Sequence, residues 1–484
     1  MDPLTIGYLS LLAIGIAIYS GIHVAIALST VSLFGVWAIT GKLKLALNFV
    51  ALAATESIAS YTFGVVPLFV LMGIAVSESG LGRDTFTAIS AMTRNVRGGL
   101  GIATVLSNAV FAAITGISIA SAAVFAKVAV PEMINAGYAR SVAVGVVAGS
   151  SVLGMLIPPS LLLILFAVLT DSSIGDLFLG GVGPGLLLAL AYCVYLVALG
   201  RLRPDLFETQ RADAAPLPER GRLRMLAPVL TLAAVVLGGI YTGFFTPTEA
   251  GAVGAMFALL LAIAMRRVNA GTFWRIAVQT GHITASVSFL IIGASIYSRM
   301  LAFSGVPASL TQMATQTGVG PLGFLFLFAL LLILLGTILD SSSILLVTVP
   351  LAFPITQALG IDVIHFGLVS VLAVEVGLLT PPLGLSVFVV QSTLKDTGIG
   401  LGEVFRGAAP FAALMASVLV LVILFPAIVT AIHWRCAHDP RRPVPAAREH
   451  RVRRPAGPRP QDRVLRPRRH GRRDPELLSG RGQG

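Results

Sequence analysis

Long apolar segments dominate the chain, and short polar stretches separate them. A membrane helix needs about 20 mostly apolar residues. This criterion predicts ten crossings, at residues 4–20, 22–40, 61–82, 141–170, 178–200, 225–244, 247–266, 276–302, 364–392 and 408–432. A polar stretch with six Arg, residues 201–224, divides the apolar region into two halves. The pattern predicts an all-α polytopic membrane protein.

Two further apolar segments do not fit as simple crossings. Residues 98–135 and 321–354 are each apolar, then small and polar in the middle, then apolar again. The charges of the flanking loops predict that each segment leaves the membrane on the same side from which it enters. We therefore expect two re-entrant hairpins, an inner one at 98–135 and an outer one at 321–354, whose broken backbone must be buried in protein or line a wet cavity.

The two halves resemble each other at a fixed offset of 223 residues. Matching positions include the residues that punctuate a backbone, namely Ser118 with Ser341, Pro131 with Pro354, Gly137 with Gly360, Gly154 with Gly377, and Pro158-Pro159 with Pro381-Pro382. Five crossings in each half would insert the second half upside down, as in the inverted repeats of secondary transporters. We expect a first repeat at 1–200, a cytoplasmic connecting loop at 201–224 and a second repeat at 225–432.

Composition and charge agree with a membrane protein. Hydrophobic residues make up 56% of the 484 residues and charged residues only 12%, against roughly 45–50% and 25% in soluble domains. The net charge of +12 is concentrated at one end, because residues 435–484 hold 15 Lys or Arg against 5 Asp or Glu. Between residues 300 and 394 there is no Lys or Arg. Since positive residues favour cytoplasmic loops, this stretch is expected to face outward.

The chemistry that the sequence offers lies where hairpin tips meet helix breaks. Proline lacks an amide hydrogen and disrupts the preceding turn, so the predicted crossings 141–170 and 364–392 should break at Pro158-Pro159 and Pro381-Pro382. The freed carbonyls and nearby hydroxyls suit a small hard cation, and the positive ends of the half-helices favour an anionic substrate. The candidate cation ligands are Thr115, Gly116, Ser118, Gly154, Pro158, Asp340, Ser341, Ser342, Gly377, Thr380 and Pro381.

Other polar residues in the apolar region could face the substrate or lie near the membrane interfaces. The candidates for facing the substrate are Ser160, Ser343 and Glu375, and an acid inside a membrane is a functional hypothesis by default. Glu56 and Arg299 are expected near the membrane interfaces. The alternative for the Pro-Pro pairs is that they only kink their helices. Catalytic and ATP-binding motifs such as HExxH, GxSxG and GxxxxGK[ST] are missing, as is a His/Cys cluster for a transition metal, so neither an enzyme nor an organic cofactor is expected.

At these motifs the sequence resembles the large membrane subunit of tripartite ATP-independent periplasmic (TRAP) transporters, within the ion transporter superfamily. The resemblance spans about residues 1–432. It is carried by VPEMINAGYAR (130–140), GMLIPPSLLLILFAVLTDSSIGDLFLGGVGPGLLLAL (154–190), FFTPTEAGAVGA (244–255), LDSSSILLVTVPLAFPI (339–355) and HFGLVSVLAVEVGLLTPPLGLSVFVV (365–390).

The resemblance implies an elevator-type transporter in the bacterial inner membrane. It implies sodium-coupled import of organic acids, such as dicarboxylates or sugar acids, with sodium as the coupling ion. It also implies two partners, a small membrane subunit on a separate chain and a periplasmic solute-binding protein, with no role for nucleic acid. Sodium would be held largely by backbone carbonyls at the positions that match Gly116, Ser118, Gly154, Pro158, Asp340, Ser341, Gly377 and Thr380.

Two alternatives for the function stay open at this point. The chain could work alone as an ion-coupled anion transporter or antiporter of the same superfamily, or serve as a membrane scaffold that transports nothing.

The basic tail, residues 435–484, is rich in Arg, Pro, Gly and Ala, which is typical of GC-rich DNA read out of frame. A disordered tail that binds anionic lipid headgroups is a second interpretation, and nucleic-acid binding is a third, which we do not expect.

Overall fold

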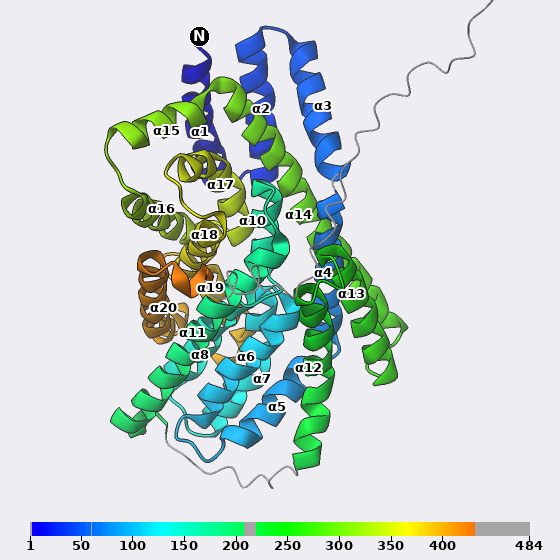
Figure 1. Cartoon of the computed structure of the whole chain (residues 1–484). Helices are drawn as coiled ribbons and strands as arrows, with labels where there is room; N and C mark the ends of the chain where they lie inside the picture. The colour runs from blue at the N-terminus through cyan, green and yellow to red at the C-terminus, as the bar shows by residue number, and fades with distance from the viewer. Residues whose placement is uncertain (1, 60, 208–218, 431–484) are drawn as a thin grey trace, which may run out of the picture. The chain divides into compact units, whose positions relative to one another are not determined.

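The computed structural model describes residues 2–59, 61–207 and 219–430, and this part of the chain is helical (Figure 1). The basic tail at 435–484 lies outside the described residues. The helices of the first half are α1 (Pro3–Tyr19), α2 (Val24–Thr40), α3 (Leu43–Ala59), α4 (Val65–Glu78), α5 (Leu81–Thr93), α6 (Gly99–Thr115), α7 (Ser118–Asn135), α8 (Arg140–Ser151), α9 (Leu153–Leu156), α10 (Leu161–Thr170) and α11 (Ile174–Leu202).

The second half is built from similar pieces. Its helices are α12 (Glu219–Tyr241), α13 (Pro247–Ala264), α14 (Ala270–Ser304), α15 (Val306–Gln316), α16 (Pro321–Gly336), α17 (Ser341–Ala358), α18 (Val363–Leu378), α19 (Leu385–Thr393) and α20 (Leu401–Leu424). Short 3-10 turns lie at Tyr61–Gly64, Pro204–Leu206 and Lys395–Thr397. The expected connecting loop at 201–224 is shorter than predicted, because α11 continues to Leu202 and α12 begins at Glu219.

Membrane crossings can be assigned from helix length and composition. In the described part, six helices and the segment Arg140–Thr170, which contains α8–α10, are long and apolar enough to cross a membrane, and the bent pair α4 and α5 would make eight spans. The two helices of that pair meet at 62°. The all-α polytopic fold predicted from the sequence is therefore confirmed.

Three helices escaped the apolar-segment criterion. Helix α3 carries a Lys, an Asn and a Glu among its 17 residues, which lowers its hydropathy. Helices α5 and α15 are short and amphipathic, and Val306 is the buried residue of α15. Apolar run length detects helices that lipid or protein surrounds on all sides, and it misses helices with one polar face.

Helix boundaries recur at the offset of 223 residues. Helices α7 and α17 begin at Ser118 and Ser341, and helices α8 and α18 begin at Arg140 and Val363. The same offset joins the starts of α2 and α13, at Val24 and Pro247. Helix α14 spans in one piece the region that α3 and α4 cover in two. The inversion of the second half relative to the first stays a prediction.

The helices that contain the predicted hairpins and breaks form one packed cluster. Helices α6 and α7 pack on each other and on α8, and α16, α17 and α18 do the same (Figure 1). The clusters are joined by α20, which packs on both α8 and α18. At the α8–α20 contact a Cβ added to Gly407 would lie 3.0 Å from the Cα of Gly145. Small residues allow this close approach, as they do in other membrane helix pairs.

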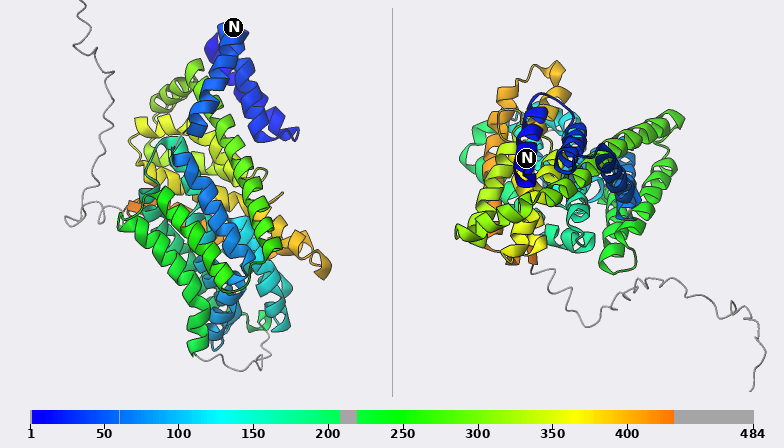
Figure 2. Two further views of the ribbon diagram at one scale, coloured as in Figure 1. Left: turned by 90° about the vertical axis from the view of Figure 1, so that its right-hand side faces the viewer. Right: turned by 90° about the horizontal axis from the view of Figure 1, so that it is seen from above.

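A second group of helices surrounds the long α14. Helix α14 packs against α2, α3 and α4, and α13 packs against α4 and α12. Figure 2 shows the N-terminal helices α1–α3, in blue, beside α14, in green. Helix α13 begins with a capping box, in which Thr246 accepts from the Glu249 amide and Glu249 accepts from the Thr246 amide. Two orphan amides at the helix start are satisfied in this way.

Ion pairs tie α14 and the preceding loop to α3, α4 and α5. Arg299 of α14 lies 2.6 Å from Glu56 of α3, so these two residues, expected separately near the interfaces, form a pair. Arg267 lies 2.7 Å from Asp84 and also donates to the Ser79 carbonyl at 3.1 Å. Arg267 thus bridges the bend between α4 and α5.

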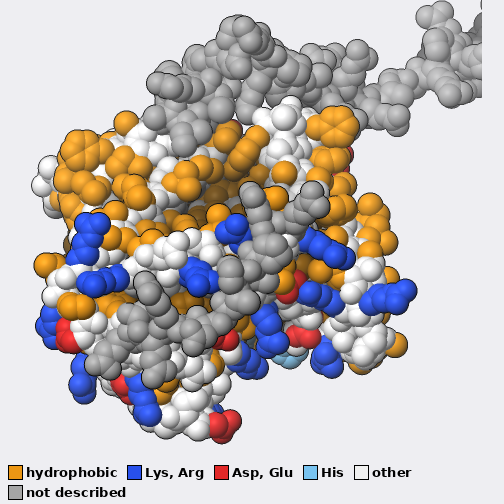
Figure 3. All heavy atoms as spheres, turned by 90° about the horizontal axis from the view of Figure 1, so that it is seen from below, with side chains coloured by type: hydrophobic (Ala, Val, Ile, Leu, Met, Phe, Trp, Pro, Cys, Tyr) orange, Lys and Arg blue, Asp and Glu red, His pale blue; other side chains and the backbone are white. Residues whose placement is uncertain are grey.

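Basic side chains gather at one end of the helices. Five exposed arginines lie between α5 and α6, at the start of α8 and around the end of α11, namely Arg94, Arg97, Arg140, Arg201 and Arg203, and these helix ends are at the lower end of Figure 1. Figure 3, which views the molecule from below, shows Lys and Arg side chains distributed over this face. These loops contact one another, because Tyr138 and Phe207 form an isolated β-bridge. This charge distribution matches the one that marks cytoplasmic loops.

Candidate functional site

The first hairpin turns at Gly116 and Ile117. Helix α6 ends at Thr115, and Gly116 follows in the left-handed conformation with φ of 61°. Glycine adopts this conformation at little cost, whereas other residues are strained there. Ile117 is extended, and α7 begins at Ser118. The Ser118 hydroxyl is buried and has no hydrogen-bond partner among the described residues.

The first broken helix opens between Leu156 and Leu161. Helix α9 ends at Leu156, the Pro158-Pro159 peptide bond is cis, and α10 begins after Ser160. The Ser160 hydroxyl accepts from the Leu163 amide and donates to the Met155 carbonyl. Ser160, a candidate for facing the substrate, is fully buried and joins the two sides of the break.

The first tip and the first break are in direct contact. The Leu161 amide donates to the Gly116 carbonyl at 3.2 Å. A Cβ added to Gly154 would lie 3.2 Å from the Ser118 backbone nitrogen, which is closer than an ordinary contact, so the tip packs tightly on the helix before the break. The sequence candidates Gly116, Ser118, Gly154 and Pro158 thus belong to one junction.

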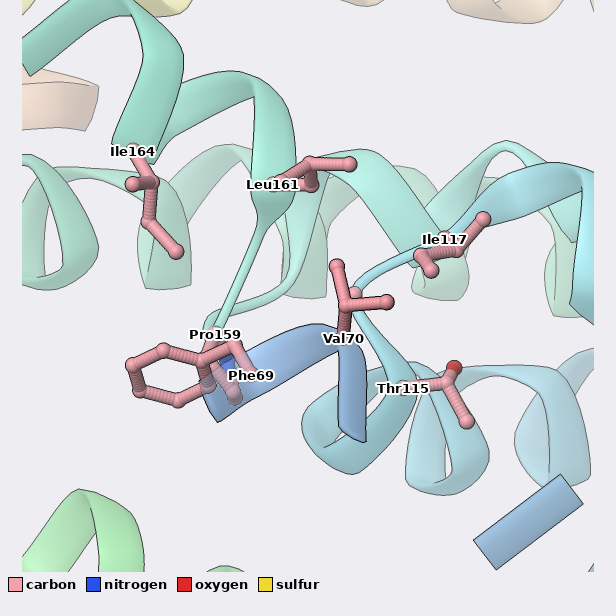
Figure 4. A pocket seen from close by; sticks show the side chains of 8 residues that line it. Phe69, Val70, Thr115, Ile117, Pro159, Leu161 and Ile164 are labelled. Carbon is pink, nitrogen blue, oxygen red and sulfur yellow. The ribbon is translucent and has the colours of Figure 1, made fainter. Parts of the chain in front are cut away.

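A small cavity lies beside this junction. It measures about 10 Å³, the size that one water-sized particle occupies. Figure 4 shows its lining by side chains of α4, the first tip and the start of α10, namely Phe69, Val70, Thr115, Ile117, Pro159, Leu161 and Ile164. The Thr115 hydroxyl donates to the Phe111 carbonyl at 3.1 Å. The cavity walls are mostly apolar, and the polar surroundings come from the backbone of the tip and the break.

A buried polar network behind the first tip was not anticipated from the sequence. Asn108 of α6 donates to the Ser150 hydroxyl of α8 at 2.7 Å and accepts from the Ser121 hydroxyl of α7. All three side chains are fully buried. The network joins both hairpin arms to the helix that leads into the break. An Asn within an otherwise apolar hairpin arm is the signal that could have indicated it.

The second hairpin turns between Gly336 and Ser341. Helix α16 ends at Gly336, and Asp340 caps the start of α17. The Asp340 carboxylate accepts from the Ser343 amide at 3.1 Å and from the Ser343 hydroxyl at 2.5 Å. Asp340 is half-buried, as is Ser342, whereas Ser341 and Ser343 are buried. Asp340 and Ser343 therefore hold each other at the helix start.

The second broken helix contacts the second tip in a similar way. Helix α18 ends at Leu378, and the Pro381-Pro382 peptide bond is cis. The Leu383 amide donates to the Thr337 carbonyl at 3.2 Å. The Thr380 hydroxyl donates to the Val376 carbonyl at 2.7 Å. Backbone contact between a hairpin tip and a Pro-Pro break therefore occurs in both halves.

The two junctions differ in exposure. Gly154 and the Pro158-Pro159 pair lie inside the protein or nearly so, while Pro381, Pro382 and Leu383 are exposed. The first junction is covered by α4, since a Cβ added to Gly73 would lie 2.7 Å from the Thr115 carbonyl oxygen. The second junction is the more accessible of the two in this conformation.

Each half-helix that follows a break packs against a helix of the other half of the chain. Helix α10, after the first break, packs against α17, after the second tip. Helix α19, after the second break, packs against α7, after the first tip. Each junction is therefore held by elements of both halves, although they are far apart in the sequence.

Glu375 lies in the same cluster but belongs to neither junction. It is 1% exposed, on α18. Gly377 faces α16, and two residues turn a helix by about 200°, so Glu375 lies on the opposite side of α18. There the carboxyl interacts electrostatically with Tyr192 of α11. Glu375, a sequence candidate for facing the substrate, therefore lies on the side of α18 that points away from the second tip.

The arrangement offers oxygen ligands and helix ends, with no redox or nucleophilic centre. The last carbonyls of a helix lack partners within that helix, and α6, α9, α16 and α18 all end at the junctions. Carbonyl, hydroxyl and carboxylate oxygens are the ligands of hard cations. In the described part of the chain, no three His, Cys, Asp or Glu side chains are grouped as a metal site would require.

Comparison with known proteins identifies the family of the chain. The family described as the tripartite ATP-independent periplasmic transporter, DctM component, matches residues 9–428. A C4-dicarboxylate TRAP transporter large permease protein of Pseudomonas aeruginosa is 34% identical over 386 residues, covering 79% of this chain and 89% of that protein. A sialic acid TRAP transporter large permease protein of Vibrio cholerae is 32% identical and covers 78% and 88%.

A solved structure shares the fold. The Alcanivorax borkumensis YdaH transporter aligns with a TM-score of 0.60 at 15% identity, over 82% of this chain and 90% of that one. The relatives are named as permease subunits of transporters and not as enzymes. The resemblance stated from the motifs is confirmed, and the chain belongs to the family of large permease subunits of tripartite ATP-independent periplasmic transporters.

Proposed function

We propose that the chain is the translocation subunit of a sodium-coupled secondary transporter that imports organic acids. The observation that carries this proposal is the crosswise packing of α10 on α17 and of α19 on α7. It brings two backbone junctions, each a hairpin tip bonded to a helix break, into one cluster of membrane helices. Paired broken helices of this kind form ion and substrate sites in transporters.

Sodium binds at the two junctions in this proposal. At the first, the carbonyls around Gly116 and Gly154 and the buried Ser118 hydroxyl provide oxygen ligands. At the second, the Asp340 carboxylate adds a negative charge beside the carbonyls that end α16 and α18. The lack of Lys and Arg from residue 300 to 394 leaves this acidic region without a competing cation in the sequence.

An organic anion binds between the half-helices. The N-termini of α10 and α19 carry partial positive charge, and Ser160 and Ser343 lie at helix starts within the junctions. The relatives named for C4-dicarboxylates and for sialic acid point to carboxylate substrates. The exposed second junction offers the entry to this site in the conformation described.

The transport step is a movement of the hairpin cluster against the helices around α14. The cluster of α6–α10 with α16–α20 is the moving part, and α1–α3 with α12–α14 form the fixed part. The chain lies in a bacterial inner membrane, and the end that carries the exposed arginines faces the cytoplasm. A small membrane subunit on a separate chain holds the fixed part, and a periplasmic binding protein delivers the substrate.

Reconstitution tests the proposal. Proteoliposomes that contain this chain, the small subunit and the binding protein should accumulate a labelled dicarboxylate or sugar acid when an inward sodium gradient is imposed. Uptake should stop when sodium is replaced by potassium or when either partner is omitted. Uptake by this chain alone would favour the stand-alone transporter, and uptake indifferent to sodium would contradict the coupling.

A further inference from the structure

Three loops at one end of the helices concentrate arginines that the proposed sodium and substrate sites do not use. Residues 94–98, 138–140 and 200–207 contain five arginines and one acid, Asp205. Asp205 pairs with Arg203 at 3.3 Å, but both side chains are more than half exposed, and exposed pairs are weak. The five arginines are all exposed and are called the basic cluster below, namely Arg94, Arg97, Arg140, Arg201 and Arg203.

Neighbouring charges do not cancel the basic cluster. Helices α7 and α20, which pack on α8, carry two charges of each sign, Lys127, Glu132, Glu403 and Arg406. The sequence at 208–218, outside the described residues, adds one Arg and two acids. An excess of three positive charges remains when all of these are counted. In the described part of the chain, Arg97, Arg140 and Arg201 form no ion pair.

Contacts between the loops hold the basic cluster together. The loop before α6 contacts the end of α11, since a Cβ added to Gly200 would lie 3.2 Å from the Arg97 carbonyl oxygen. The start of α8 contacts the turn after α11, since the Ala139 amide donates to the Leu206 carbonyl at 3.0 Å. The three loops therefore form one surface at the lower end of the helices (Figure 1).

One side of α11 relates the basic cluster to the membrane. Leu186, Leu190 and Val194 are 62%, 61% and 59% exposed, and Ala198 and Arg201 are also exposed. At 100° per residue these five positions lie on the same side of the helix. An exposed apolar stripe on a membrane-spanning helix faces the acyl chains. Arg201 lies about 10 Å along the axis beyond Val194, which places its guanidinium group where headgroups replace acyl chains.

Exposed apolar side chains lie among the arginines. Val96 is 45% exposed and Leu202 is 78% exposed, and each is next to an arginine of the basic cluster in the sequence. Basic and large apolar side chains occur together on surfaces that lie in the headgroup region, where the apolar groups reach the acyl chains. A soluble acidic partner would account for the positive charge but would leave these apolar residues in water. Anionic lipid accounts for both.

We propose that the basic cluster binds the headgroups of anionic phospholipids such as phosphatidylglycerol. A guanidinium group donates two parallel hydrogen bonds to phosphate oxygens, and clustered arginines attract the negative charge of the headgroup. Phosphatidylcholine carries the same phosphate with a compensating cation, so the positive excess favours phosphatidylglycerol. The inference goes beyond the proposed function and does not depend on sodium coupling or on the substrate.

The first test measures lipid retention by native mass spectrometry. The purified chain, equilibrated with equal amounts of phosphatidylglycerol and phosphatidylcholine, should retain severalfold more phosphatidylglycerol. Arg140→Gln/Arg201→Gln should lose this preference, whereas Arg140→Lys/Arg201→Lys keeps the charge and should retain most of it. Lys44→Gln/Arg266→Gln removes two exposed charges outside the basic cluster and should behave as wild type. Equal retention of the two lipids by wild type, or the same loss in both Gln variants, would overturn the proposal.

The second test repeats the comparison in a bilayer. A lipid that binds the folded chain stabilises it, so the thermal midpoint of wild type should be a few degrees higher in nanodiscs that contain phosphatidylglycerol than in pure phosphatidylcholine. This difference should shrink between about 0.1 and about 1 M salt, because screening shortens the range of the attraction from about 10 to about 3 Å. It should be absent in Arg140→Gln/Arg201→Gln and present in Lys44→Gln/Arg266→Gln. A lipid effect that is equal in the two variants would contradict a site at the basic cluster.

Discussion

Gly336 and Gly377 lie backbone against backbone where the second hairpin meets the second broken helix. A Cβ added to Gly377 would stand 2.6 Å from the Cα of Gly336, and one added to Gly336 would stand 2.8 Å from the Cα of Gly377. Real Cβ atoms do not approach a backbone this closely, so the contact exists only because both residues are glycine. The spacing of α16 and α18, and with it the position of the tip, depends on this pair.

Gly377→Ala should therefore disturb the second junction. The clash must be relieved by a shift of α16 or α18, and overpacking of this kind costs about 1–3 kcal/mol. We expect a lower thermal midpoint and a loss of sodium-driven uptake. Gly402→Ala is the matched control, because a Cβ there meets nothing within 4 Å and alanine favours a helix. Equal behaviour of the two variants would show that the α16–α18 contact is not tight.

Much of this arrangement could be predicted from residues whose local effect is strong. The Gly-rich and Pro-rich positions gave the locations of both breaks, since a Pro-Pro pair cannot continue a helix. The positions of the tips followed from small polar residues between two apolar runs, and the structure starts α7 and α17 at the two serines that the 223-residue offset pairs.

What the sequence could not predict depends on contacts between distant elements. The crossover of α10 onto α17 has no local signal, because α10 is apolar on all its faces and nothing in its sequence selects one neighbour. The orientation of the Glu375 side chain also could not be predicted from the sequence. Its position two residues before Gly377 suggested the junction, but helical geometry turns it toward α11. Helix α3 was missed because its Lys, Asn and Glu residues lower its hydropathy.

The network around Asn108 should be required for the first junction to form. Asn108→Ala leaves the buried Ser121 and Ser150 hydroxyls without their side-chain partner, which costs about 1–3 kcal/mol. We expect a lower thermal midpoint and a reduced apparent affinity for sodium, because the hairpin arms and α8 lose their link. Asn48→Ala removes an exposed Asn from α3 and should change neither. A normal sodium affinity in Asn108→Ala would show that the network is structural only.

The bend between α4 and α5 should depend on Arg267. Its ion pair with Asp84 is partly shielded, with side-chain exposures of 34% and 16%. A double-mutant cycle with Arg267→Gln and Asp84→Asn should give a coupling of about 1 kcal/mol, discounted for the exposure of Arg267. The same cycle on Arg203 and Asp205, which are more than half exposed, should give about zero. Equal couplings would mean that burial does not strengthen the first pair. Thermal unfolding of the purified variants provides the measurement.

Ser118 offers a clean separation of stability from ion binding. Its buried hydroxyl has no protein partner among the described residues, so Ser118→Ala removes an unsatisfied polar group and should leave the thermal midpoint unchanged or raise it. If the hydroxyl is a sodium ligand, the sodium concentration for half-maximal uptake should rise severalfold. Ser417→Ala, on the exposed side of α20, is the control. An unchanged sodium requirement would remove the Ser118 side chain from the site.

Asp340 allows its charge to be tested apart from its role as a helix cap. Its carboxylate accepts from the Ser343 amide at the start of α17, and Asn caps a helix about as well as Asp. Asp340→Asn should therefore keep the fold while removing the negative charge. We expect the sodium concentration for half-maximal uptake to rise roughly tenfold, which corresponds to about 1.4 kcal/mol. Asp340→Ala loses both charge and cap, and should also lower stability by about 0.5–2 kcal/mol. If Asp340→Asn takes up substrate with the sodium requirement of wild type while Asp340→Ala fails, the cap is what transport needs, and the carbonyls at the breaks must hold the cation without this charge.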